Sequence, residues 1–462
     1  MDNMTNVLLV SYLFPPSGGV GIPRAISYTR YLPRHGCRVF VVTARNAATP
    51  LYDPELLSLV PPETRVSRVF NPELSYSFRD RIWRMLEPPH RQKGRKTATG
   101  QGSTSPFRTV RSAAKSFVRS VIERMTFPDV QNAWIPFATR EACKIIEYNN
   151  IDAVILNIPP YSTFKVVVAL RRRYPDLKLL IDLRDDWLGY YLVQFDTPSD
   201  YKFRRAQALE RAAMESASFV STVTPALVDN LRSRYPDLPR ERFFYAPNGY
   251  EPDSFRDFDR CPRNRGKMVI TYFGTVYMTQ VYSPQNYLDA IDELPEKIRS
   301  EIESCFIGRV TAESQPCLSG RKSAIRRLGF LPKFEGIRRL EETDYLLLIV
   351  NDPTAHAGKL FDYLASGKPI LALSPPDGEI AHILERTRTG WCADAGDKLA
   401  IKSMLLAAYQ RFKLGGAIVD PDWVAIREYS WPEIVRKVVN TTGIAAVRER
   451  DIGVDPETET AS

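Results

Sequence analysis

The chain has few of the residues that bind metals or form disulfides. Among its 462 residues there are only six cysteines and four histidines. The cysteines lie far apart, without a C-x-x-C pair, at positions 37, 143, 261, 305, 317 and 392. This spacing excludes the common zinc motifs, and a chain of this length does not need a disulfide framework. We therefore expect no structural metal and a reducing, cytoplasmic environment.

Long apolar runs are also missing. A membrane-spanning helix needs ~18 apolar residues, and one of the longest runs here, residues 345–350, is far shorter. The opening residues MDNMTNVLLVSYLF lack a basic cluster and end at two prolines, which favours a buried strand over a signal peptide. The chain is 44% hydrophobic and 11% aromatic, as folded proteins are. Its length fits two domains of roughly 200 residues each.

Short apolar runs alternate with amphipathic stretches along most of the chain. We expect strands at residues 6–11, 38–43, 153–156, 179–183, 268–273, 305–307, 344–350 and 370–373. We expect helices at residues 23–32, 162–173, 284–294 and 359–366. This alternation indicates β-α-β units, and so an α/β fold with parallel sheets. A polar stretch at 250–267 predicts a linker between domains 1–250 and 268–435, followed by a helix end and a disordered tail at 436–462.

The net charge of +9 is concentrated in one segment. Residues 79–125 contain twelve Lys or Arg and three acidic residues, which accounts for the whole excess. Within this segment, residues 88–106 are almost free of apolar side chains and predict a mobile loop. Residues 107–125 have helical spacing and form either an ordinary basic surface helix or an interfacial helix on anionic lipid.

Residues 357–369, AGKLFDYLASGKP, are the strongest candidate for chemistry. Gly358 opens the expected helix, where free N–H groups and the helix dipole favour an anion. Lys359 adds a positive charge in the first turn, and Asp362 lies on the same face three residues later. A carboxylate there could accept hydrogen bonds from both hydroxyls of a ribose. The block therefore fits a nucleoside diphosphate, although Lys359 and Asp362 could simply pair with each other on a surface helix.

This block resembles the donor-binding helix of family 4 glycosyltransferases, which are retaining enzymes with the GT-B fold. Three further segments resemble the family in the same order: the opening VLLVSYLFPPSGGVGIPRAISYTRYLPRHGCRVFVVT, LLIDLRDDW at 179–187 and YAPNGYEPDSF at 245–255. The second of these resembles the D-x-R-D-x-W subgroup. The resemblance runs from about residue 6 to about residue 435. It implies two Rossmann-like domains that face each other across a cleft, with the nucleotide sugar on the C-terminal domain and the acceptor on the N-terminal one.

The resemblance also implies roles for individual residues. Donor-binding residues would be Gly18, Gly19, Gly21, Gly274, Arg309, Gly358, Lys359, Leu360, Asp362 and Glu379. Catalytic residues would be Arg184, Asp185 and Lys359, with Asp186 and Asn248 on the acceptor side. The alternatives are a strand-end salt bridge for the acidic pair and an ordinary Asn-Gly turn. The family's Arg and Lys after Gly274 are absent here, so that Arg309 or Lys359 would replace them, and Thr354 stands at the first glutamate of the E-x7-E pair.

We therefore expect transfer of a sugar, from a UDP- or GDP-linked donor, to a glycan or lipid-linked acceptor in cell-surface polysaccharide or glycolipid synthesis. The reaction would proceed with retention and without metal or cofactor, and residues 79–125 would dock on the anionic inner face of the cell membrane. The D-x-D at 257–259 lies in the linker and is attributed to chance.

Three alternatives stay open. One is a nucleotide-sugar-binding module without transferase activity. Another is an NADP-dependent oxidoreductase, because Gly19, Gly21 and Arg24 form an incomplete dinucleotide fingerprint and Arg45 follows the second strand. The third is a nucleic-acid-binding protein, although the basic stretch lacks a recognised module and no nucleic-acid partner is expected.

Overall fold

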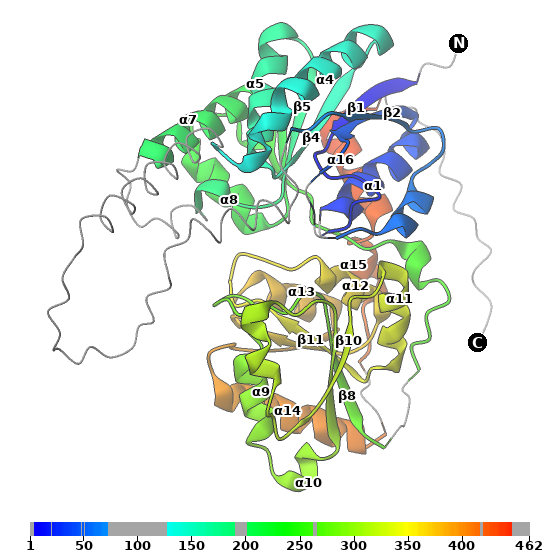
Figure 1. Ribbon diagram of the computed structural model, residues 1–462, viewed down its shortest axis with the longest axis vertical. Coiled ribbons are helices and arrows are strands. Elements are labelled where there is room, and N and C mark those ends of the chain that lie inside the picture. Colours follow the sequence, from blue (N-terminus) through cyan, green and yellow to red (C-terminus); the bar gives the residue numbers. More distant parts are fainter. Residues whose placement is uncertain are drawn as a thin grey trace, which may run out of the picture.

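The computed structural model describes residues 4–19, 21–47, 49, 51–72, 127–189, 201–261, 266–415 and 419–445. This part of the chain forms two α/β domains, one above the other along the long axis of the molecule (Figure 1). The basic segment 79–125 and its expected loop and helix lie outside the described residues. Among the described helices, none is both long enough and apolar enough to cross a membrane.

Within the described residues, the first domain has a seven-stranded parallel sheet with the order β3-β2-β1-β4-β5-β6-β7. The strands are β1 (Thr5–Val10), β2 (Cys37–Ala44), β3 (Arg65–Val69), β4 (Ala153–Ile158), β5 (Lys178–Leu183), β6 (Phe219–Thr222) and β7 (Phe243–Tyr245). The helices packed with it are α1 (Ile22–Tyr31), α4 (Ile135–Asn149), α5 (Phe164–Arg173), α7 (Tyr201–Ser216) and α8 (Pro225–Arg234). All six residues of β4 are buried, as expected for a central parallel strand covered on both faces.

The second domain repeats this plan with six strands in its described residues, in the order β10-β9-β8-β11-β12-β13. The strands are β8 (Met268–Phe273), β9 (Ile302–Ile307), β10 (Ala324–Gly329), β11 (Tyr345–Ile349), β12 (Ile370–Leu373) and β13 (Gly390–Ala393). The helices are α9 (Gln285–Asp292), α10 (Glu296–Arg299), α11 (Lys333–Arg339), α12 (Lys359–Ser366), α13 (Glu379–Thr387), α14 (Lys398–Lys413) and α15 (Trp423–Arg427). In both sheets the strand order reverses beside the first strand, and sheets of this kind bind ligands beyond the carboxyl ends at that point.

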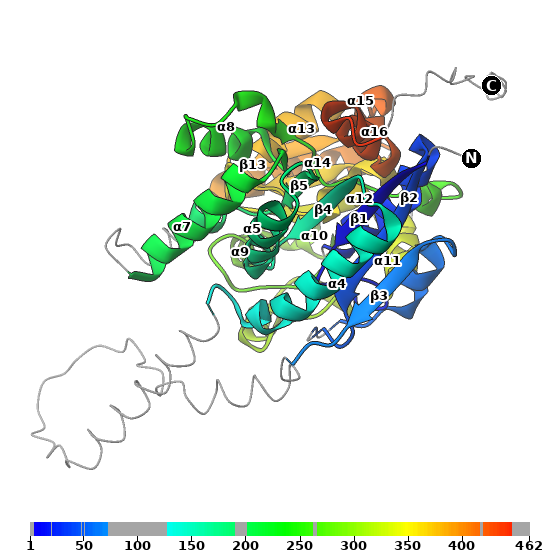
Figure 2. The same cartoon turned by 90° about the horizontal axis from the view of Figure 1, so that it is seen from above.

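The chain ends its described part with α16 (Trp431–Thr442), which returns to the first domain. Its buried apolar side chains, among them Ile434 and Val438, join the cluster that contains Val7 and Tyr28. Figure 2 shows α16 on the same side of the molecule as the first strands. The boundary expected at residue 435 therefore falls inside this helix. Its apolar face recurs every three to four residues and covers the first sheet, so that the helix belongs to the core of that domain.

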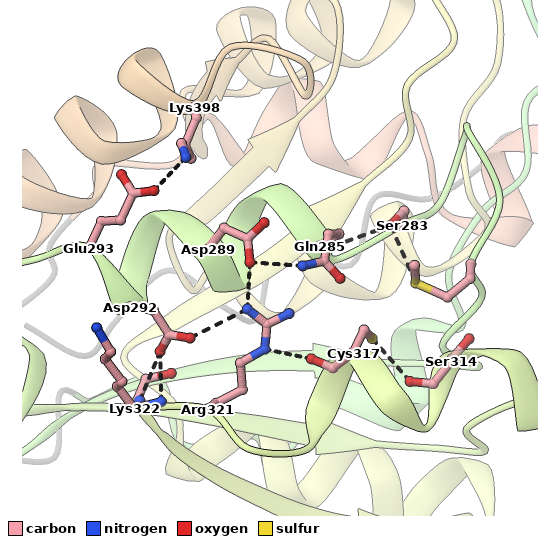
Figure 3. Close-up of polar contacts among 12 residues, drawn as sticks. Ser283, Gln285, Asp289, Asp292, Glu293, Ser314, Cys317, Arg321, Lys322 and Lys398 are labelled. Carbon is pink, nitrogen blue, oxygen red and sulfur yellow. Dashed lines mark hydrogen bonds and ion pairs between the residues drawn. The ribbon is translucent and has the colours of Figure 1, made fainter. Parts of the chain in front are cut away.

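A polar network fixes the connection between β9 and β10 (Figure 3). Arg321 donates from Nη1 to Asp289 at 2.5 Å and from Nε to the carbonyl oxygen of Cys317 at 2.6 Å. Asp292 accepts hydrogen bonds from the backbone N–H groups of Lys322 and Ser323 at 3.1 and 2.9 Å. Since Asp289 and Asp292 belong to α9, this network holds the connection that starts after β9 against that helix.

Candidate functional site

The carboxyl ends of the two sheets enclose a pocket of about 240 Å³. From the first domain, the predicted residues Gly18, Gly19 and Asn248 line it. From the second domain, the predicted residues Gly274, Arg309, Gly358, Lys359 and Asp362 line it. The glycine loop that precedes α1 and the turn that opens α12 therefore share one pocket.

Two glycines at strand ends form part of the pocket wall. Gly274 follows β8 with a φ of +138°, and Gly308 follows β9 with a φ of +136°. A Cβ on Gly308 would lie 2.2 Å from the carbonyl oxygen of Gly274, which is closer than real Cβ atoms come. Only glycine allows this approach, so that bare backbone is presented to the pocket at both positions.

Lys359 is the first residue of α12 and lies against the end of β8. Its Nζ is 3.5 Å from the centroid of the Tyr272 ring, and a Cβ on Gly274 would lie 3.1 Å from the same nitrogen. Burial lowers the pKa of Lys359 to about 7. The N-cap residue of α12, Gly358, has no side chain to cap the helix. The N–H groups of Leu360 and Phe361 donate to the carbonyl oxygens of Ala357 and Gly358, so that the amides of Gly358 and Lys359 are the ones that can meet a ligand. These amides and the lysine together suit an anion, which would in turn favour the charged form of the lysine.

Lys333 is a pocket residue that sequence reasoning missed. It is the first residue of α11, and its Nζ lies 3.2 Å from Oδ1 of Asp362 in α12. Burial raises the pKa of Asp362, and the charge of Lys333 opposes this shift. With Arg309 and Lys359, Lys333 completes a set of three basic side chains among the described residues that line the pocket. They supply positive charge even though the sequence after Gly274 has no basic residue before α9.

The end of β5 and the residues that follow it are held by contacts of three side chains. Asp182 is fully buried and pairs with Arg24 at 2.6 Å. Asp186 pairs with Arg234 at 2.9 Å and also accepts a hydrogen bond from the N–H of Gly189 at 3.0 Å. Trp187 stacks on a tyrosine ring with centroids 5.0 Å apart and an interplanar angle of 12°. Arg184 and Asp185 take no part in these three contacts.

Arg184 lies under the glycine loop. A Cβ on Gly21 would lie 1.8 Å from its Nη1, so that the absence of a side chain at Gly21 makes room for the guanidinium. Nη2 of Arg184 also donates to the carbonyl oxygen of Pro159 at 3.0 Å. Gly21 and Arg184 thus support the loop, and neither lines the pocket.

Asp185 is exposed and does not itself line the pocket. Among the described residues its carboxylate forms no ion pair. Neighbouring parts of the chain desolvate the carboxylate and raise its pKa, while the charge of Arg184 opposes the rise. Its charge reaches the second domain, because it contributes, after burial, to the raised pKa of Tyr282. The structure therefore distinguishes the two neighbouring aspartates, since Asp186 is paired with Arg234 and Asp185 is exposed.

Two expected donor residues lie away from the pocket. The side chain of Leu360 is fully buried in the core of the second domain, because this position on α12 faces the sheet. Glu379 is the first residue of α13 and accepts a hydrogen bond from the N–H of Ala226 in α8 at 3.3 Å. Neither side chain contributes to the wall of the pocket.

Glu379 instead forms one of the contacts that join the domains. His356 Nε2 lies 2.7 Å from the carbonyl oxygen of Val223, and Asp53 accepts a hydrogen bond from the N–H of Lys333 at 3.4 Å. The imidazole nitrogen facing a carbonyl oxygen must carry the proton. These contacts bring the two sheet edges together around the pocket. Within the described residues, no cluster of three His, Cys, Asp or Glu could hold a metal ion.

The two sheet orders and the pocket between their carboxyl ends define a GT-B fold, as the sequence predicted. Solved structures share this arrangement. Anabaena Alr3699/HepE, solved in complex with UDP, matches with a TM-score of 0.59 and 12% identity over 95% of this chain and 100% of that chain. WaaG, a glycosyltransferase involved in lipopolysaccharide biosynthesis, matches with a TM-score of 0.52 and 13% identity over 95% of this chain and 96% of that chain.

A curated relative is similar in sequence over a shorter stretch. The probable glycosyltransferase WbjE of Pseudomonas aeruginosa is 28% identical over 155 residues, which is 32% of this chain and 37% of that protein. The match therefore spans little more than a third of the length of the relative. No protein-family model matches the chain.

Proposed function

We propose that this protein is a glycosyltransferase that takes a sugar from a nucleoside diphosphate sugar bound between its domains. The observation that carries the proposal is that Gly18 and Gly19 of one domain and Gly358 and Lys359 of the other line the same pocket. The similarity to Alr3699/HepE, which has been solved with UDP and with UDP-glucose, supports a UDP-linked donor. The name of WbjE supports the same activity.

In this proposal each part of the donor is bound by different residues of the pocket. Lys359 and the first N–H groups of α12 bind the diphosphate, with Arg309 as a second cation. Asp362 accepts hydrogen bonds from the ribose, and the backbone of Gly18 and Gly19 covers the sugar. Fixed donors that face the charge developing on a leaving group can each lower a barrier by ~3 kcal/mol. Departure of the nucleoside diphosphate is thus assisted without a metal, and the sugar is transferred with retention.

The acceptor approaches from the first domain, where the exposed carboxylate of Asp185 orients the hydroxyl group of the acceptor. A glycan or lipid-linked acceptor in cell-surface polysaccharide synthesis is proposed. The basic composition of residues 79–125 supports docking on an anionic membrane leaflet at the cytoplasmic face. Sedimentation with vesicles tests this part: binding that depends neither on anionic lipid nor on residues 79–125 would contradict it.

Thermal stabilisation by UDP-, GDP-, ADP- and TDP-sugars tests the proposed activity. A ligand at 100 times its Kd stabilises the folded protein by about 2.7 kcal/mol. The stabilising donor is then incubated with acceptor pools, and release of the nucleoside diphosphate is measured. Lys359→Ala should lose both stabilisation and turnover, while Lys297→Ala, an exposed lysine on α10, serves as control. Full donor affinity and turnover in Lys359→Ala would refute the proposal.

A binding module without transferase activity is a second candidate. The absence of basic residues between Gly274 and α9 favours it, because the usual neutralisation of the leaving diphosphate is altered. This function would be identified by a donor that stabilises the protein but is neither transferred to an acceptor nor slowly hydrolysed.

A further inference from the structure

The pair formed by Lys333 and Asp362 lies in the wall of the pocket. The two residues lie at the starts of two different helices: Lys333 is the first residue of α11, and Asp362 lies in the first turn of α12. Their side chains are only 21% and 11% exposed, and Nζ lies 3.2 Å from Oδ1. The pair stands beside an apolar part of the pocket wall that contains Phe330 and Leu331. A bound ligand would therefore remove water from this pair.

The pocket has two lysines in different environments. Lys359 lies over the Tyr272 ring and beside Gly274, at the end of β8. Lys333 lies against Asp362 and takes no part in that contact. If Lys359 binds the diphosphate, as in the proposed function, then Lys333 lies at the part of the site where Asp362 receives the ribose. The positive charge of Lys333 therefore acts on the carboxylate of Asp362, which accepts hydrogen bonds from the ribose hydroxyls.

We propose that Lys333 determines the specificity of the site for ribonucleotides, because it holds Asp362 as a charged acceptor for both the 2′- and the 3′-hydroxyl of the ribose. This inference rests on the proposed function. A carboxylate has two oxygens and can accept one hydrogen bond from each hydroxyl, whereas a protonated carboxyl group loses part of this capacity. A 2′-deoxyribose would leave one carboxylate oxygen buried without its partner, and such unpaired groups are costly.

Other charged residues line the same pocket as Asp362. Lys359 lies on its own helix, Arg309 follows β9, and Asp53 comes from the first domain and binds the N–H of Lys333. Among these groups Lys333 forms the ion pair with Asp362. Burial raises the pKa of Asp362 and Lys333 opposes the rise. Selectivity for ribose is therefore present above the pKa of Asp362, is lost as the pH falls through it, and is lost at a higher pH when Lys333 is removed.

Calorimetric titration with UDP and with 2′-deoxy-UDP between pH 5 and pH 8.5 tests the inference. The wild-type protein should prefer UDP by about 10- to 100-fold, the range expected for a hydrogen bond to a charged group. Lys333→Met should bring the ratio toward one and move its loss at acid pH to higher values. Lys333→Arg should keep the ratio, and Asp362→Asn should remove both the ratio and its pH dependence. Lys297→Met is the surface control, and circular dichroism checks that each variant is folded.

Three outcomes would overturn the inference. Equal binding of the two nucleotides by the wild-type protein would overturn it and leave the proposed function standing. An unchanged ratio with an unchanged pH profile in Lys333→Met would do the same. If the protein bound neither of these nucleotides and no other nucleoside diphosphate, the proposed function would be overturned together with the inference.

Discussion

Arg24 and Asp182 form a bidentate ion pair in the interior of the first domain. Nε and Nη2 of Arg24 each lie 2.6 Å from a different carboxylate oxygen, and the two side chains are 1% and 0% exposed. Arg24 also donates to the carbonyl oxygen of Pro247 at 2.7 Å, next to the pocket residue Asn248. The pair therefore joins the helix after the glycine loop, the strand that leads to Asp185, and the junction between the domains.

Removing one member of this pair should destabilise the protein strongly. Arg24→Met leaves the charge of Asp182 buried, and breaking a pair in this way costs about 3–5 kcal/mol. Urea denaturation measures the loss. The double variant Arg24→Met/Asp182→Leu should recover part of it, because no charge is then left unpaired. Arg30→Gln, which affects a more exposed pair, is the control. A fully stable Arg24→Met protein would show that the pair does not hold the domain.

The central part of the fold could be predicted because its strands are apolar runs. Helix α12 and strand β12 have the predicted bounds. The strands that were missed are short or lie toward the edges of the sheets. Strand β10, with the sequence AIRRLG, has no fully buried residue, and neither has β3. Such strands depend on pairing with a neighbour, which sequence periodicity does not reveal.

The site could be predicted only where its residues are close in sequence. The block 358–362 and the glycine loop carry local signals that a helix N-terminus and a turn explain. Lys333 enters the pocket only because α11 packs beside α12. The choice between Asp185 and Asp186 depends on Arg234, which lies on α8 and pairs with Asp186. These relationships arise from tertiary packing, which the spacing of residues along the chain does not encode.

The two aspartates after β5 should differ when each is replaced by asparagine. Asp185→Asn should reduce turnover about a hundredfold, the low end of what a positioned acid-base group contributes (~10²–10⁴), while leaving the melting temperature close to that of the wild type. Asp186→Asn weakens the ion pair with Arg234 and should lower the melting temperature. Donor turnover and thermal melting, measured on both variants, check the contrast. Equal effects of the two variants on turnover would contradict the assignment.

Gly308→Ala should be more harmful than the substitution of another glycine with positive φ. At Gly308 the new Cβ would lie 2.2 Å from the carbonyl oxygen of Gly274, and the φ of +136° is unfavourable for alanine. The backbone strain alone costs ~1–3 kcal/mol, and relief of the contact would move the neighbouring Arg309. Gly329→Ala is the matched control, because its φ is +73° and its Cβ meets nothing within 4 Å. Denaturation and nucleotide affinity are compared, and equal stability losses would contradict the close approach.

Nucleotide affinity should depend on the charge of Lys359 around neutral pH. Burial lowers the pKa of Lys359 to about 7 in the free protein, so that the amine is charged below this value and increasingly neutral above it. A bound diphosphate favours the charged form, and binding then takes up a proton above pH 7. Affinity should consequently fall by up to about tenfold per pH unit as the pH rises from 7 toward 9.

Calorimetric titration with UDP at several pH values, in buffers of different ionisation enthalpy, measures both the affinity and the proton uptake. Phosphate groups themselves titrate near ~6, so the comparison is made above pH 7. Lys359→Gln should bind more weakly and show a flat profile over this range, with Lys297→Gln as the control for a lost surface charge. If the affinity of Lys359→Gln for UDP changed with pH in parallel with that of the wild type, the buried amine would not contact the phosphates. The two proteins differ in no other residue.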